Sequence, residues 1–183
     1  MNFDYKHLLD GNFHPDSKVW VYQSNRLFTL NEALEIEELL KEFTTNWKSH
    51  GTPVKGDGHL FFGQFIVLLA DETATGVSGC STDSSVRMIK DIEQRFKVNM
   101  FDRTTLAFII NDKSDPSMPQ DYRIQLLPLS QLQYAVENGF IHADTIYFNN
   151  LVQTKVELKS NWMVAVKDSW LSSKINLIAK GHL

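Results

Sequence analysis

The stretch from Leu60 to Ala70 constrains the fold of this 183-residue chain more than any other. It is rich in aromatic and β-branched residues and carries no charged side chain. Such a run is typical of a strand that is buried on both faces, because a strand with one solvated face alternates apolar and polar residues. Its longest uninterrupted apolar part, Phe65 to Ala70, is far shorter than the roughly 20 residues with which a helix crosses a bilayer. We therefore expect a central strand of a globular protein here and no insertion into a membrane.

A segment with helical periodicity precedes this strand. Thr29 and Glu32 make a capping box, and apolar residues then recur at helical spacing as far as Trp47. The helix is expected to end near Gly51, because glycine accepts the left-handed conformation at a helix C-terminus. The glycine-rich segment 51–58 that follows is predicted to be a loop.

A second amphipathic helix is expected after the buried strand. Apolar residues recur at helical spacing from Val86 to Phe96, and the N-cap is expected within 81–83. Between this helix and the C-terminus, the segment 111–121 is rich in proline, aspartate and serine and predicts a long loop. Further β-rich runs predict strands at 19–22, 104–110, 122–127, 145–148 and 162–166.

Helices and strands therefore alternate in a mixed pattern, with a short helix expected between Ser130 and Gly139 and a second capping box at Thr154. This pattern predicts an α+β or α/β fold, with a single mixed sheet of about four to six strands and two main amphipathic helices packed on it. Residues 1–183 are expected to form a single domain, and a subdomain boundary, if there is one, is expected in the loop 111–121. Parallel and antiparallel strand pairing both stay open.

Composition and charge argue against several classes of partner. With 18 Lys and Arg against 22 Asp and Glu, the net charge is −4, which provides no basic surface for a nucleic acid. The single cysteine, Cys80, cannot form an internal disulfide, and the N-terminal residues lack the basic and apolar regions of a signal peptide. We therefore expect a cytoplasmic protein. The 6 histidines show no metal-ligand spacing, so neither a metal nor another cofactor is expected.

The most unusual local sequence is the small polar loop 78–87, which leads into the second helix. A helix N-terminus favours an anion or a thiolate, because its free N–H groups and the helix dipole place positive charge there. Cys80 is therefore a candidate reactive thiol, with Arg87 and His50 as candidate assisting groups. An anion would instead bind at Ser81, Thr82, Asp83, Ser84 and Ser85. In the alternative interpretation, which capping and burial preferences favour, the polar side chains only cap the helix and Cys80 packs as a small apolar residue.

Two familiar catalytic patterns fail in this chain. A phosphatase loop places five residues between its cysteine and its arginine, whereas six separate Cys80 from Arg87, which turns the arginine by about 100° on a helix. Gly51 and Gly56 have the spacing of the two glycines of a P-loop, but the lysine and hydroxyl residue that should follow are missing. Without that lysine no cation reaches the β and γ phosphates of a nucleotide. ATP hydrolysis by the P-loop mechanism is therefore not supported.

Four stretches together carry a resemblance to a known family: Val19 to Arg26, Trp47 with His50 and Gly51, Ser78 to Arg87, and Asp102 with Arg103. The third stretch, SGCSTDSSVR, is the most specific. The segment 148–155 and Ser169 with Trp170 extend the likeness over most of the chain. On these residues the chain resembles a family of short bacterial proteins of uncharacterised function that often carry the label ABC-transporter ATPase.

We expect a non-enzymatic binding or interaction module, because the chain combines abundant core residues with no intact catalytic motif. Trp20, Tyr22 and Trp170 are candidates for an interface with an unknown protein or small-molecule partner, or with a second copy of the chain. Two alternatives stay open: an enzyme or redox-responsive protein that uses Cys80 at a helix N-terminus, and an anion-binding module. The sequence does not decide whether the protein is an enzyme.

Overall fold

The computed structural model of the chain describes residues 2–9, 11–71, 79–111 and 122–174, with the backbone alone for 79–81. The chain divides into two compact units. The N-terminal unit consists of Asn2–Asp102 and Asn150–Lys159, and the C-terminal unit consists of Arg103–Asn149 and the residues from Ser160 on. The boundary suggested at 111–121 falls almost wholly outside the described residues, and the expectation of a single domain stays a prediction.

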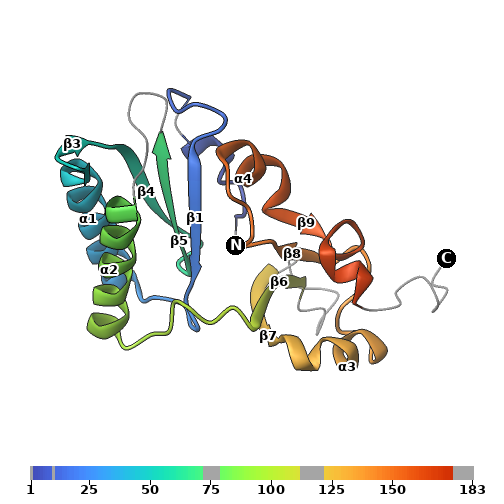
Figure 1. Ribbon diagram of the computed structural model, residues 1–183. Coiled ribbons are helices and arrows are strands. Elements are labelled where there is room, and N and C mark those ends of the chain that lie inside the picture. Colours follow the sequence, from blue (N-terminus) through green and yellow to red (C-terminus); the bar gives the residue numbers. More distant parts are fainter. Residues whose placement is uncertain (1, 10, 72–78, 112–121, 175–183) are drawn as a thin grey trace. The chain divides into compact units, whose positions relative to one another are not determined.

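A three-stranded antiparallel sheet forms the centre of the N-terminal unit (Figure 1). Its strands lie in the order β1 (Lys18–Gln23), β5 (Phe65–Asp71) and β4 (Lys55–Phe61). Every residue of β5 is buried, which confirms the expected central strand. The single strand expected over 60–70 is wrong at its start, because the chain reverses at Phe62 and Gly63, whose φ angles are 56° and 63°.

Two helices, α1 (Leu30–Asn46) and α2 (Gly79–Phe96), pack on one face of this sheet (Figure 1). The capping box at the start of α1 is confirmed. The N–H of Glu32 donates to Thr29 Oγ1 at 3.3 Å, and the N–H of Thr29 donates to the Glu32 carboxylate at 2.8 Å. The helices and the sheet share one apolar core, which includes Tyr22, Ile36, Leu40, Ile66, Leu68, Ile89, Ile92 and Phe96.

α1 ends at Asn46, earlier than its apolar pattern predicts. Trp47 is extended and buried, and it leads into a small hairpin of β2 (Lys48–Ser49) and β3 (Thr52–Pro53). His50 and Gly51, with φ angles of 49° and 84°, form the turn of this hairpin rather than the end of the helix. Gly51 therefore has the left-handed conformation that the sequence predicts, but this conformation closes the β2–β3 hairpin and does not end α1.

The loop expected over 51–58 is wrong, because most of that segment belongs to β3 and β4. The glycines of β4 have a packing role instead of a role in a turn. A Cβ atom at Gly56 would lie 2.6 Å from the ring of Trp47, so only glycine lets the end of α1 approach the strand this closely.

A four-stranded antiparallel sheet forms the C-terminal unit, in the order β7 (Tyr122–Pro128), β6 (Thr105–Asn111), β8 (Ile146–Phe148) and β9 (Met163–Ala165). α3 (Leu132–Glu137) contributes to the core of this unit. α4 (Lys155–Asn161) begins in the N-terminal unit, where the N–H of Glu157 donates to Thr154 Oγ1 at 3.3 Å. The core of the C-terminal unit includes Leu106, Phe108, Leu132, Ala135, Ile141, Tyr147, Val166 and Leu171.

The expected single sheet is wrong, because the described strands form three sheets, of three, two and four strands. β5 and β6, which flank α2, belong to different sheets, so this strand–helix–strand order makes no crossover within one sheet. The class is mixed α+β, and every pair of the described strands is antiparallel. In the part of the chain that the structure describes, no helix has both the length and the apolar character to span a membrane.

Candidate functional site

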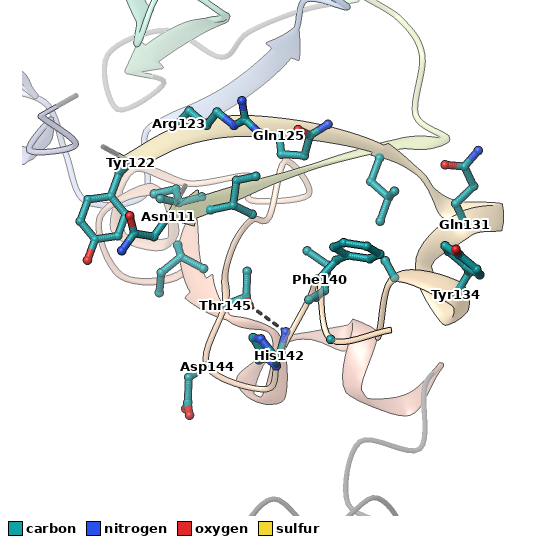
Figure 2. A pocket seen from close by; sticks show the side chains of 17 residues that line it. Asn111, Tyr122, Arg123, Gln125, Gln131, Tyr134, Phe140, His142, Asp144 and Thr145 are labelled. Atoms are coloured by element: carbon teal, nitrogen blue, oxygen red, sulfur yellow. Dashed lines mark hydrogen bonds between the residues drawn. The ribbon is translucent and has the colours of Figure 1, made fainter. Parts of the chain in front are cut away.

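A pocket of about 910 Å³ lies in the C-terminal unit, between the β6–β7 sheet and α3 with the segment 139–146 (Figure 2). Pairing across β6 and β7 places Leu106, Phe108 and Ile110 on one face, opposite Leu127, Gln125 and Arg123. At the first of these pairs the face joins the core with α3. Ile110, Arg123, Gln125 and Leu127 of this face line the pocket. α3 also contributes to the pocket, through Tyr134 and Ala135.

The end of α3 shapes the rim of the pocket. Gly139 has a φ of 73°, as its expected role as a helix stop requires, and the N–H groups of Gly139 and Phe140 donate to the carbonyls of Val136 and Ala135 at 3.1 and 2.8 Å. Phe140 then projects from the chain with 65% of its surface exposed, and Tyr134 is 64% exposed. Two exposed aromatic rings on one apolar pocket form the kind of patch that marks a binding surface.

Polar groups occupy defined places around this apolar wall. Figure 2 shows Asn111 and Tyr122 at one end, Gln131 and Tyr134 at the other, and Phe140 between them. The N–H of His142 donates to Thr145 Oγ1 at 2.9 Å, which fixes the turn opposite β7 (Figure 2).

Two polar side chains of the pocket, Asp144 and Asn111, differ in whether they have a hydrogen-bond partner. The carboxylate of Asp144 accepts a hydrogen bond from Lys167 Nζ at 2.6 Å, and this bond raises the pKa of Lys167. The side-chain oxygen of Asn111 is buried and has no hydrogen-bond partner among the residues that the structure describes. Most buried polar atoms in folded proteins have a partner, so this oxygen is an unusual feature of the pocket wall.

The sequence-predicted site lies elsewhere, at the start of α2 in the N-terminal unit. The side chains of Cys80 and Ser81 lie outside the described residues. Ser85 is buried, and its hydroxyl donates to the Thr82 carbonyl at 2.7 Å, within the helix. Thr82 and Ser84 are half-buried, whereas Asp83 and Arg87 are exposed.

The structure brings His50 toward the same helix. β2 lies against α2, and His50 follows β2 directly as an exposed residue. The chain around His50 therefore lies close to the helix that contains Cys80 and Arg87. The chemical roles of these three residues, and anion binding at 81–85, stay predictions.

Of the three aromatic residues expected at an interface, Tyr22 is buried and therefore excluded, whereas Trp20 and Trp170 are half-buried and their role in an interface stays a prediction. Tyr22 is only 7% exposed and belongs to the core of the N-terminal unit. Trp20 is half-buried with its ring 6.0 Å from that of Trp47. Trp170 is half-buried against Tyr147, to whose hydroxyl its Nε1–H donates at 3.2 Å.

A pair of ionisable side chains lies on β4, in a groove of about 490 Å³ that α1 also lines. His59 Nε2 and Asp57 Oδ2 are 3.1 Å apart. The hydrogen bond to Asp57 raises the pKa of His59, against the opposing effect of burial. Burial raises the pKa of Asp57, but the hydrogen bond and charge of His59 outweigh it, so this pKa lies below its ordinary value.

The carboxylates of this groove also satisfy the free edge of the sheet. The N–H of Gly58 donates to Asp57 Oδ1 and the N–H of Leu60 donates to Glu37 Oε1, both at 2.8 Å. Because β4 is an edge strand, these donors have no neighbouring strand to bond to. The groove is therefore explained by the fold. Within the described ranges, no group of three or more His, Cys, Asp or Glu side chains could hold a metal ion.

Sequence reasoning missed the pocket of the C-terminal unit. Its walls come from strands and a helix that are separated along the chain, and no local spacing marks them. The sequence did contain one signal of an exposed apolar surface. Two aromatic residues, Tyr134 and Phe140, lie on either side of the expected helix stop Gly139, and neither belongs to the buried positions of α3.

Comparisons of the chain with protein-family models, with curated proteins and with solved structures give no match. The resemblance to the family of short bacterial proteins therefore stays a prediction.

Proposed function

We propose that this chain is a non-enzymatic binding protein, and that the pocket of its C-terminal unit takes up a mostly apolar small molecule. The pocket itself carries the proposal: it measures about 910 Å³ and combines Ile110, Leu127 and Ile146 in its walls with Phe140 and Tyr134 at its rim. Concave, mainly apolar sites of roughly 300–1,000 Å³ with a few polar groups are the usual binding sites of small molecules.

The energy of binding would come mainly from covering the exposed apolar surface. Removal of apolar surface from water contributes roughly 25 cal/mol per Å². A flat ligand that covers half of the Phe140 ring and half of the Tyr134 ring gains about 1 kcal/mol from each of them. The amide of Gln131 and the side-chain oxygen of Gln125, whose Nε2 already donates to the Leu126 carbonyl, offer hydrogen bonds that would orient such a ligand within the pocket.

Titration with 8-anilinonaphthalene-1-sulfonate, whose fluorescence rises in apolar surroundings, tests the proposal. The intact chain should bind it saturably, and Phe140→Ala should weaken binding about fivefold because one apolar wall is lost. Leu151→Ala is the matched control, since Leu151 is a 58% exposed apolar residue of the N-terminal unit, outside the pocket. Its affinity for the dye should equal that of the wild type.

Partly folded chains also bind this dye, so each variant must first show a cooperative thermal transition close to that of the wild type. The proposal is wrong if the folded wild type gives no saturable signal. It is also wrong if Phe140→Ala and Leu151→Ala bind the dye as tightly as the wild type.

Thiol chemistry at Cys80 is a second candidate function, favoured by the position of β2 against α2. This contact puts the chain around His50 near the helix that contains Cys80, and a nearby histidine would lower the pKa of a thiol. The alkylation measurement that tests it is given in the Discussion.

A further inference from the structure

Building on the proposed binding function, we infer that the ligand of the C-terminal pocket carries a neutral N–H or O–H group, which donates a hydrogen bond to the side-chain carbonyl of Asn111. The inference names the class of ligand: an aromatic or aliphatic molecule with one such donor at its edge. Its basis is the unsatisfied oxygen of Asn111 on the pocket wall.

The position of Asn111 follows from the sheet. It is the last residue of β6 and lies directly opposite Tyr122, the first residue of β7. Figure 2 shows both side chains at the end of the pocket remote from Tyr134. Asn111 and Ile110 are neighbours on β6 and point to opposite faces of the strand, so a ligand that covers Phe140 meets Asn111 at the end of the pocket and not along the face of Ile110.

The oxygen of Asn111 is unusual because it is buried and no described residue donates to it. A buried carbonyl without a partner forfeits the hydrogen bond that it makes with water in the unfolded chain. The side chain lines the pocket, and the oxygen itself is covered, so the inferred bond requires a rotation about the Cβ–Cγ bond that exposes the oxygen to the ligand. A donor on the ligand would supply the missing bond.

The surroundings favour a neutral donor over an ammonium group. Ile109, Ile110 and Ile146 line the pocket, and an ammonium group placed against them would lose much of its hydration. The one carboxylate among the lining side chains of the described residues is that of Asp144, which already bonds to Lys167.

A matched pair of fluorescent probes tests the inference: 2-phenylindole, which has an N–H donor, and 1-methyl-2-phenylindole, in which a methyl group replaces that hydrogen. The dissociation constant of each is measured with the full chain by titration of the probe fluorescence. We expect the wild type to prefer 2-phenylindole about tenfold, because a site that bonds a donor discriminates against the analogue that lacks it.

Two variants locate the preference. Asn111→Leu keeps a similar volume but has no acceptor, so its two dissociation constants should agree within about twofold. Asn111→Asp keeps an acceptor oxygen and should keep the preference for 2-phenylindole. If Asn111→Leu does not fold, Asn111→Ala, which also lacks the acceptor, replaces it in the same comparison.

The outcomes separate this inference from the proposed function. Equal binding of both probes by the wild type overturns the inference and leaves the binding function standing. A preference that persists in Asn111→Leu overturns the role of Asn111. If neither probe binds while the naphthalene dye binds saturably, the inferred ligand class is wrong. If neither the probes nor the dye bind, the proposed function fails and the inference with it.

Discussion

Replacing Gly56 by alanine should destabilise the N-terminal unit by about 1–2 kcal/mol. The new Cβ atom would lie 2.6 and 3.0 Å from two ring carbons of Trp47, closer than atoms can pack. Trp47 is only 2% exposed, and the ring of Phe43 lies 5.0 Å from it, so it has little room to move. Overpacking of this kind costs about 1–3 kcal/mol, and the reduced freedom of the unfolded chain returns about 0.4–1 kcal/mol.

Urea unfolding followed by tryptophan fluorescence measures this effect. The midpoint for Gly56→Ala should fall by about 1 M relative to the wild type, with an unchanged slope. Gly11→Ala is the matched control, because an added Cβ there meets no atom within 4 Å and the change in the unfolded chain is the same. Equal midpoints for the two variants would refute the argument that α1 needs glycine on β4.

The capping box, the β4 ion pair and the cysteine give three further predictions. Thr29→Ala removes the acceptor of the Glu32 N–H and should lower the free energy of unfolding by about 1 kcal/mol in urea titrations; an unchanged value would contradict the role of the cap. The pKa of His59 is raised in the folded state, so the stability it contributes is complete below its unfolded-state pKa and is lost as the pH rises through the folded-state pKa. Urea midpoints between about pH 5 and pH 9 should therefore fall more in the wild type than in His59→Gln, and parallel profiles would exclude a role for the pair with Asp57. The thiol proposal predicts alkylation of native Cys80 with an apparent pKa below about 8.5, and a cysteine that reacts only after unfolding would contradict it.

Local signals in the sequence were sufficient for the main helices and the central strand. The capping box of Thr29 and Glu32 depends on atoms within three residues of one another, so the sequence alone predicts it. The uncharged run 65–70 has no solvated face and could only be central. Burial pattern and capping are local properties, and both are confirmed.

The edge strand β4 was missed because its glycines are required by packing against the α1 region, and glycines in a sequence suggest a loop. Gly56 and Gly58 suggest a loop, yet they lie in β4, where Trp47 and Leu40 of the α1 region pack against them. The hairpin between β4 and β5 was missed for a related reason. Phe62 takes a positive φ that is uncommon for a bulky residue, so no turn residue marks its first position.

The pocket was beyond sequence reasoning for a different reason. The pocket depends on how α3 is placed against the sheet. Ala135 of α3 and Ile110 of β6 both line it, and the space between two such residues is set by the folded chain. Neither residue is unusual by itself. The stop at Gly139 is readable from the sequence, but what that stop leaves uncovered is a property of the folded unit.

Two features of the C-terminal unit carry a cost when no ligand is bound. Ile110 is only half-buried at the pocket wall, and among the described residues the buried oxygen of Asn111 has no partner, which costs about 1–3 kcal/mol. One ligand with an apolar body and a single donor relieves both, because it covers the face and bonds to the oxygen. Such a ligand binds only the folded unit, so its binding free energy adds to the stability of that unit. The N-terminal unit, whose sheet face is closed by α1 and α2, gains nothing from it.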